Sequence, residues 1–115
     1  QTRQLRMIIT LKKTNGTIGM VDLFELDPHH ERGAVGILVA PDHQGKGFGR
    51  EALQLMCSYA FDFLHLHQLY AHILQDNENC LKLFSANGFK SCGLFNEWIK
   101  TNNGYKNVVV MQRIN

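Results

Sequence analysis

A glycine-rich segment at residues 44–50, which reads Gln-Gly-Lys-Gly-Phe-Gly-Arg, is the part of the sequence most suited to chemistry. It follows an apolar run at residues 36–39 and leads directly into a segment with helical periodicity. The start of a helix presents unpaired N–H groups and a partial positive charge, and glycines allow an anion to come close to the backbone. The spacing therefore predicts an anion site, and the expected guest is a pyrophosphate.

The order of residues within this loop excludes two other phosphate-binding loops. A dinucleotide-binding fold needs its third glycine one residue later, and a Walker A loop needs Gly-Lys followed by Ser or Thr. A structural glycine turn is the alternative when the loop is considered by itself. The residues on both sides of the loop therefore decide its interpretation.

Three strands are expected before the loop. Residues 6–12 show the alternation of a strand, and Asn15-Gly16 then supplies the positive φ angles of a tight hairpin turn. Residues 17–26 form the returning strand, which ends at Asp27-Pro28. Residues 34–39 are apolar on both faces, which is typical of a central strand that is covered by helices.

The loop opens into a helix at residues 50–66, whose apolar stripe has helical spacing and comprises Leu53, Met56, Cys57, Ala60 and Leu64. Residues 69–74 indicate another buried strand. Asp76 and Asn77 offer side-chain caps for a second helix that ends at Asn87-Gly88. Two last strands are expected at residues 89–95 and 105–113. This order of elements predicts a mixed α/β sheet.

The bulk composition is that of one small globular domain. The chain has 115 residues, of which 44% are hydrophobic, and this is sufficient for a modest core. A net charge of +2 gives no argument for nucleic acid or a membrane as partner. No apolar segment reaches membrane-spanning length and no secretory leader is evident, so a cytoplasmic location is the default expectation. The cysteines lack metal-ligand spacing and are interpreted as reduced core thiols: Cys57, Cys80 and Cys92.

The six histidines do not predict a metal site. His65 and His67 would face different directions at the end of a helix, and His29 and His30 are adjacent in a loop. No metal cofactor is therefore expected.

Together with its flanks, the loop resembles the acyl-CoA loop of the GNAT N-acetyltransferase superfamily, written Gln/Arg-Gly-x-Gly-x-Gly/Ala. The resemblance extends from about Ile18 to Met111. The most similar branch is that of the spermidine and ribosomal-protein N-acetyltransferases. Within that branch, Asn103-Gly104-Tyr105 and residues 108–111 resemble the polyamine enzymes in particular.

The resemblance implies a mixed, mostly antiparallel sheet with helices on its faces and two splayed central strands. Acetyl-CoA is the implied cosubstrate, with its pantetheine arm between the splayed strands, where backbone amides near Leu38 and Val39 polarise the thioester carbonyl. Asn77 matches a family position that often contacts CoA, and a plain helix cap is its equal alternative. The implied CoA-binding residues are Leu38, Val39, Gln44, Gly45, Lys46, Gly47, Phe48, Gly49, Arg50 and Asn77.

The sequence departs from the family pattern at two positions. Acetylation of an amine needs a base for the acceptor and benefits from an acid at the departing thiolate. The usual Tyr acid of the family matches Phe84, which has no proton to donate, and Ala34 lies where a carboxylate is often found. Glu25 and Tyr105 are the remaining catalytic candidates, and a solvated strand residue is the alternative interpretation of Glu25.

These observations predict an acetyl-CoA-dependent N-acetyltransferase that acts by direct attack within a ternary complex. The expected acceptor is a primary amine, either a small polyamine or a protein N-terminus. A non-catalytic CoA-binding or regulatory module is the alternative, because Phe84 replaces the usual acid. The chain is expected to form a single acyl-CoA-binding domain over residues 1–115 that lacks the N-terminal strand and helices of the family. Exposed edge strands favour a homo-oligomer.

Overall fold

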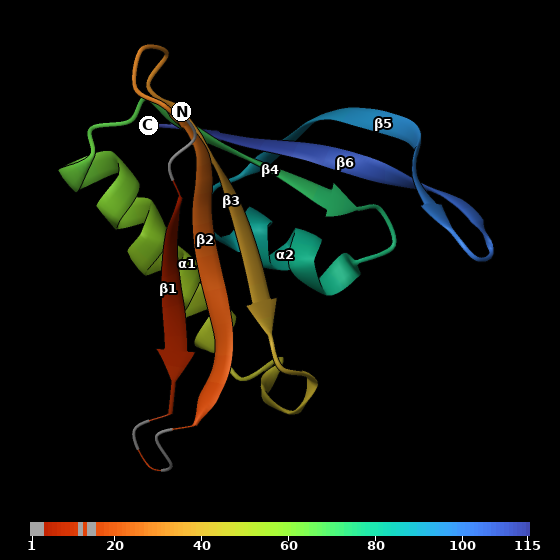
Figure 1. Cartoon of the computed structure of the whole chain (residues 1–115), viewed down its shortest axis with the longest axis horizontal. Helices are drawn as coiled ribbons and strands as arrows, with labels where there is room; N and C mark the ends of the chain where they lie inside the picture. Colours follow the sequence, from red (N-terminus) through yellow and green to blue (C-terminus); the bar gives the residue numbers. More distant parts are fainter. Residues whose placement is uncertain (1–3, 12, 14–15) are drawn as a thin grey trace.

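The computed structural model describes residues 4–11, 13 and 16–115, which form one six-stranded sheet with two α-helices (Figure 1). The strands are β1 (Leu5–Thr10), β2 (Thr17–Asp27), β3 (Arg32–Val39), β4 (Gln68–Leu74), β5 (Lys90–Thr101) and β6 (Gly104–Ile114). The helices are α1 (Phe48–Ser58) and α2 (Glu78–Ala86), with a short 3-10 turn η1 (Pro41–His43) and a π-helical turn η2 (Tyr59–Phe63). The strand order is β1-β2-β3-β4-β6-β5.

Neighbouring strands of this sheet are antiparallel except for β3 and β4. A parallel pair needs a crossover connection, and the segment from η1 to η2 supplies it. The expected class, a mixed and mostly antiparallel α/β sheet, is thereby confirmed. The expected hairpin turn at Asn15-Gly16 falls partly outside the described residues, because Asn15 is not among them. On either side of it β1 and β2 pair from Leu5 opposite Leu23 to Thr10 opposite Thr17.

α1 begins at Phe48 and passes into the π-helical turn η2 after Ser58. In η2 the Leu64 N–H donates to the Tyr59 carbonyl over 3.0 Å, which is the wider spacing of a π turn. A π turn contains one residue more than an α turn, so the side chains that follow are rotated relative to the buried stripe of α1. Phe61 is consequently only 5% exposed, while Leu64, which was expected in the core, is half-buried. Within the described residues no helix has the length and apolar content needed to cross a membrane.

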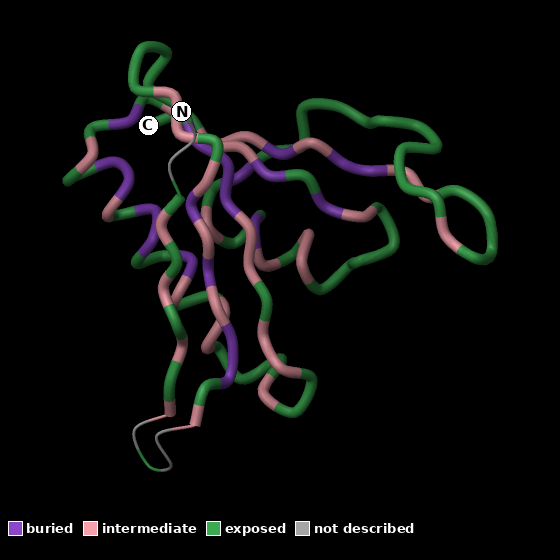
Figure 2. The backbone as a smooth tube through the Cα atoms, in the orientation of Figure 1, coloured by how far each residue is buried: buried purple, intermediate pink, exposed green. Residues whose placement is uncertain are grey.

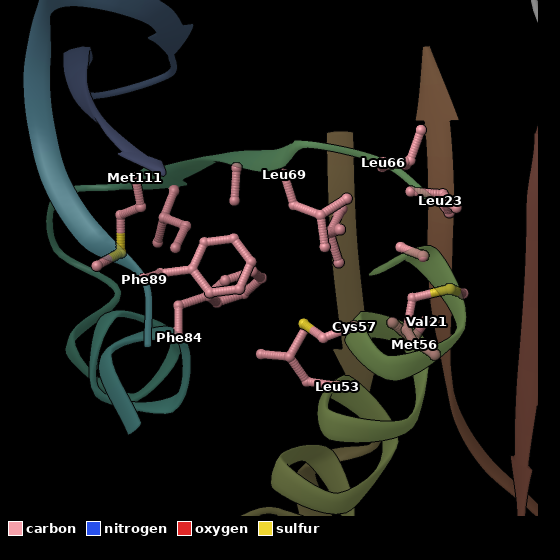
Figure 3. Packing of buried hydrophobic residues seen from close by; sticks show 14 of the residues in the cluster. Val21, Leu23, Leu53, Met56, Cys57, Leu66, Leu69, Phe84, Phe89 and Met111 are labelled. Atoms are coloured by element: carbon pink, nitrogen blue, oxygen red, sulfur yellow. The ribbon is translucent and has the colours of Figure 1, made fainter. Parts of the chain in front are cut away.

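Both helices pack on the same face of the sheet, where they share one hydrophobic core (Figure 3). Alternation along the strands selects the residues that reach this core. In β4, Leu69 and Ala71 are 0% and 1% exposed, and the residues between and beside them point to the other face. In α2, Phe84 is 1% exposed and packs edge-on against Phe89, with 4.9 Å between the ring centroids.

The opposite face of the sheet carries no helix in the described part of the chain. Ile8 and Leu38 lie on this open face and are 52% and 62% exposed. Arg6 and Asp22 also lie there and form a two-point ion pair with N···O distances of 2.7 and 2.9 Å. The apolar sequence of residues 34–39 predicted helices on both sides of that strand, and the structure differs because both helices lie on one side.

β3 and β4 pair over only a short stretch, from Arg32 opposite Gln68 to Ala34 opposite Tyr70. Beyond these residues the two strands separate. Figure 1 shows them leaving their shared end in different directions, with α2 beside the opening between them. The splayed central strands that the resemblance implied are therefore present.

β5 and β6 form a long hairpin whose outer strand is exposed along almost its whole length (Figure 2). Trp98 and Tyr105 on this hairpin are 58% and 60% exposed. Cys92 lies on the same strand and is exposed, so the prediction that all three cysteines are core thiols is wrong for this residue. Cys57 is buried, Cys80 is half-buried, and all three cysteines are free thiols.

Replacing Leu53 by Ala is expected to destabilise the domain by about 2–5 kcal/mol, because truncating a fully buried side chain leaves a cavity in the core. Leu53 is 0% exposed, whereas Leu55 on the same helix is 59% exposed. The matched control Leu55→Ala should change the free energy of unfolding by only about 0.5 kcal/mol. Urea unfolding followed by circular dichroism measures both values. Equal losses would contradict the one-sided packing of α1.

Candidate functional site

A cavity of about 510 Å³ lies beside the end of β3 that has separated from β4. Its walls are the last residues of β3, the glycine loop with the first turn of α1, and one side of α2. Of the residues predicted to bind CoA, all except Lys46 and Phe48 line this cavity: Leu38, Val39, Gln44, Gly45, Gly47, Gly49, Arg50 and Asn77. Lys46 is exposed to solvent, and Phe48 lines a second cavity of about 630 Å³ between β1 and α1.

The glycine loop holds a conformation that leaves its amides without acceptors. Gly45 and Gly47 have φ angles of 76° and 88°, in the left-handed region that favours glycine. Gly47 is the N-cap of α1, and none of the described side chains caps the helix. In the described chain the Glu51 N–H donates to the Gly47 carbonyl over 3.1 Å, and the amides of residues 45–50 donate no hydrogen bond. The loop therefore offers a row of free N–H groups at the positive end of a helix.

Two contacts fix this loop against the end of β3. Gln44 Nε2 donates a hydrogen bond of 2.9 Å to the Val39 carbonyl. A β-carbon on Gly49 would lie 3.2 Å from Val39 Cγ2 and 3.3 Å from Leu83 Cδ2, so a glycine here allows α1 to approach both β3 and α2 closely. The first turn of α1 is thereby held beside the opening between the strands.

The pairing of β3 with β2 shows which amides of β3 face this opening. Ala40 N–H donates to the Ile18 carbonyl over 2.7 Å, and the direction of the backbone groups alternates along an antiparallel strand. Leu38 therefore directs its backbone groups toward β2, whereas Ile37 and Val39 direct theirs toward the opening. Leu38 was expected to contribute an amide, but its amide points toward β2, although the residue is one of those that line the cavity.

The cavity is positively charged. Arg50 and Lys82 line it, and no Asp or Glu of the described residues does so. Side chains that carry positive charge complement phosphate groups, and Arg adds directional hydrogen bonds. These surroundings suit an anionic guest.

Asn77 caps α2 as expected, and its position also lets it reach the cavity. Its Oδ1 accepts a hydrogen bond of 3.2 Å from the Cys80 N–H, which caps α2. The residue also lines the cavity. Cys80 forms part of the same wall, and burial raises the pKa of its thiol. At neutral pH this thiol is therefore protonated.

α2 contributes more residues to the cavity wall than the sequence predicted. Four residues that were not predicted line the cavity at helical spacing: Asn79, Lys82, Leu83 and Ala86. Positions i, i+3, i+4 and i+7 share one face of a helix, so the periodicity of residues 78–86 is the signal that points to them. His43, which directly precedes the glycine loop, also lines the cavity.

The groups considered for proton transfer lie away from the cavity wall. Phe84 is part of the core, so the position of the family's Tyr acid contributes no polar group. Tyr105 lies near the tip of the β5–β6 hairpin. Glu25 has a φ of 50° at an irregularity in β2, and its Oε1 accepts a hydrogen bond of 3.0 Å from the Tyr70 hydroxyl. Burial, followed by the hydrogen bond to Glu25, raises the pKa of Tyr70.

The histidines are spread over the molecule. His29 and His30 contact each other in the turn between β2 and β3, with ring centroids 4.7 Å apart. His72 lies on β4, with its ring near those of Tyr70 and Phe95. Within the described residues, no three His, Cys, Asp or Glu side chains are grouped so as to hold a metal ion.

Comparison with known proteins gives several relatives. The spermidine N(1)-acetyltransferase of Vibrio cholerae is 35% identical over 91 residues, which are 79% of this chain and 53% of the relative. The enzyme of the same name from Escherichia coli K12 is 31% identical over 93 residues, or 81% of this chain and 50% of the relative. An N-acetyltransferase 9-like protein of Nematostella vectensis is 42% identical over 73 residues, covering 62% of this chain and 37% of its own.

Solved structures and a family model agree with these relatives. A variant of the spermidine N-acetyltransferase SpeG from Vibrio cholerae superimposes with a TM-score of 0.89 at 31% identity, covering 96% of this chain and 65% of its own. The chain spans about half the length of the curated relatives it matches. A family model described as an acetyltransferase (GNAT) domain matches residues 1–90. Because this match covers most of the chain and the fold agrees with it, the chain belongs to the GNAT family of acetyltransferases.

Proposed function

We propose that this domain binds acetyl-CoA and transfers the acetyl group to a primary amine by direct attack within a ternary complex. The observation that carries the proposal is the row of free amides at residues 45–50. It adjoins a cavity lined by Arg50 and Lys82, and no carboxylate of the described residues lines that cavity. A pyrophosphate accepts several hydrogen bonds and carries the negative charge that these groups complement.

The cofactor is proposed to run from the glycine loop into the opening between β3 and β4. The pantetheine arm contains amide groups, which can pair with the free edge of β3 as a neighbouring strand would. Ile37 and Val39 turn their backbone groups to this edge, as the pairing with β2 requires. An N–H group in this position stabilises the oxyanion that forms when an amine attacks the thioester carbonyl.

A small alkyl polyamine is the acceptor that we favour. Two of the relatives are named for acetylation of spermidine, and Asn103-Gly104-Tyr105 resembles the polyamine branch. A peptide N-terminus presents the same nucleophile, a primary amine, and is the alternative acceptor. The two differ in charge, since a polyamine carries several ammonium groups.

A non-catalytic CoA-binding module is the second candidate function. It is favoured by Phe84, which is buried in the core, and by Ala34, which is 3% exposed where the family often has a carboxylate. Neither residue provides an acid or a base. CoA binding does not depend on them, because the proposed contacts are made by the backbone of the loop and of β3.

Replacing Gly45 and Gly47 together by Ala is expected to weaken CoA binding by about tenfold or more. Each alanine in the left-handed region costs about 1–2 kcal/mol, so the loop of the free variant adopts other φ angles. Binding must then return the loop to its present conformation, and this cost lowers the affinity. Gly93→Ala is the matched control, because its β-carbon would meet nothing within 4 Å and its φ lies outside that region. Calorimetry with CoA measures all three affinities. Unchanged binding in the double variant would argue against the loop as the phosphate site.

Thiol release from acetyl-CoA, measured with a panel of amines, separates the two candidate functions. An acetyltransferase should release thiol with spermidine or a diamine, and more slowly with a peptide that has a free N-terminus. A tertiary amine is the control, because it cannot form a stable amide. CoA binding without thiol release for any primary amine would favour the non-catalytic module.

The Cys80 thiol should report on occupancy of the cavity. Its pKa is raised by burial, and only the thiolate reacts, so alkylation by iodoacetamide should be slow at pH 7 and accelerate as the pH rises above the usual thiol value. CoA should slow this reaction by covering the wall. Alkylation of Cys92, which is exposed on β5, provides the internal control and should not respond to CoA. Peptide mass mapping follows both sites, and equal protection of both would count against this location of CoA.

A further inference from the structure

Acetylation of an ammonium group requires a proton acceptor. His72, a histidine that no sequence pattern indicated, lies on β4 beside the opening between β3 and β4. The last residue of β4 that pairs with β3 is Tyr70, opposite Ala34. His72 is therefore the first residue of β4 that lies past the paired stretch and shares a face with Tyr70.

Alternation along β4 places His72 on the open face of the sheet. Ala71 and Ile73 are 1% and 4% exposed beneath the helices, whereas His72 between them is exposed. The cavity proposed for acetyl-CoA is bounded by the end of β3 and by α2, and α2 lies on the helix side of the sheet. A thioester that enters from the helix side is accessible to an amine from the open face, which is the face of His72.

The His72 ring is positioned by aromatic packing and leaves its nitrogens free. It lies edge-on to Phe95 with 5.5 Å between centroids and at 5.8 Å from the Tyr70 ring. Among the described residues, no hydrogen bond or ion pair engages its side chain. The titratable neighbour of His72 on β4 is Tyr70, whose hydroxyl donates a hydrogen bond to Glu25 of β2. On β6 the residue opposite His72 is Val110, which does not titrate. A neutral imidazole held in this way has one nitrogen available to accept a proton.

The other ionisable groups around the opening are less suited to act as a base. Glu25 already accepts the Tyr70 hydroxyl hydrogen at 3.0 Å. His43 lies at the glycine-loop end of the cavity, with its ring 6.1 Å from that of Phe48. Burial raises the pKa of the Cys80 thiol, so the thiol stays protonated at neutral pH and cannot accept a proton.

We propose that His72 is the base of the acetyl transfer, an inference that rests on the proposed function. A ring nitrogen of His72 removes one proton from the acceptor ammonium group. The neutral amine attacks the thioester carbonyl carbon with its lone pair, the C–N bond forms, and the C–S bond breaks with its electrons passing to sulfur. The second amine proton reaches the departing thiolate through water, and His72 releases its proton to solvent. Tyr70 and Phe95 act as positioning residues for the imidazole.

Replacing His72 by Gln tests this role, with His67→Gln as the matched control. His67 is exposed just before β4, and its hydrogen bonds are made by its backbone, to Glu31 and from Asn115. With an alkyl amine at pH 7, His72→Gln is expected to lower kcat by ~10²-fold or more, while His67→Gln keeps the wild-type rate. The affinity for CoA, measured by calorimetry, should match the wild-type value in both variants.

A second acceptor separates a base from a residue that only supports the structure. An O-alkylhydroxylamine is a primary amine that is already neutral at pH 7, so no proton has to be removed before it attacks. The loss caused by His72→Gln should therefore be much smaller with this acceptor than with the alkyl amine. Raising the pH toward about 10, where the neutral fraction of an alkyl amine is many times larger than at pH 7, should likewise reduce the loss of rate in the variant.

The outcomes distinguish this inference from the function on which it rests. A wild-type rate in His72→Gln with the alkyl amine, or an equal loss with both acceptors, overturns the assignment of His72 alone. A wild-type domain that binds CoA and acetylates no amine overturns the proposed activity, and the role of His72 with it.

Discussion

The early end of the β3–β4 pairing is the constraint on which the site depends. β4 pairs with β6 along its whole length, from Gln68 opposite Ile114 to Leu74 opposite Val108, and so it follows β6 away from β3. β3 follows β2 instead. One edge of β3 is then left without a strand partner over residues 35–39, and peptide groups need hydrogen bonds from water or a ligand when no strand provides them. The same divergence exposes the backbone groups of β3 that border the cavity.

Local sequence patterns were sufficient to predict the elements and the glycine loop. Periodicity located α1 and the central strands, because it depends only on neighbours along the chain. The loop followed from residue types, since Gly45 and Gly47 can adopt positive φ angles without a steric cost. Asn77 was predicted as a cap for a similar reason: its side chain reaches an amide of its own helix. The resemblance to the family added the splay, which no local pattern indicates.

The features that the sequence did not reveal depend on packing between distant segments. The π turn η2 leaves Leu64 only half-buried at the side of the core, and only the shape of the core decides how deeply it is buried. The burial of Phe84 depends on Phe89 beyond the end of its helix. His72 was overlooked because its surroundings depend on which face of β4 turns away from the helices, and sheet register settles that choice. Cys92 is exposed because nothing in the described chain covers the outer strand of the hairpin.

The free edge of β3 also bears on the order in which two substrates bind. Residues 35–39 are held by a partner strand on one side only, whereas β6 is held on both, so the end of β3 keeps more conformational freedom. In the proposed complex, a pantetheine arm paired with this edge stiffens β3 and fixes Leu38, whose side chain lies on the open face. An amine that arrives afterwards meets a surface that is already ordered and loses less entropy there. For the proposed acetyl transfer, an incomplete sheet of this kind favours sequential kinetics in which the thioester enters first.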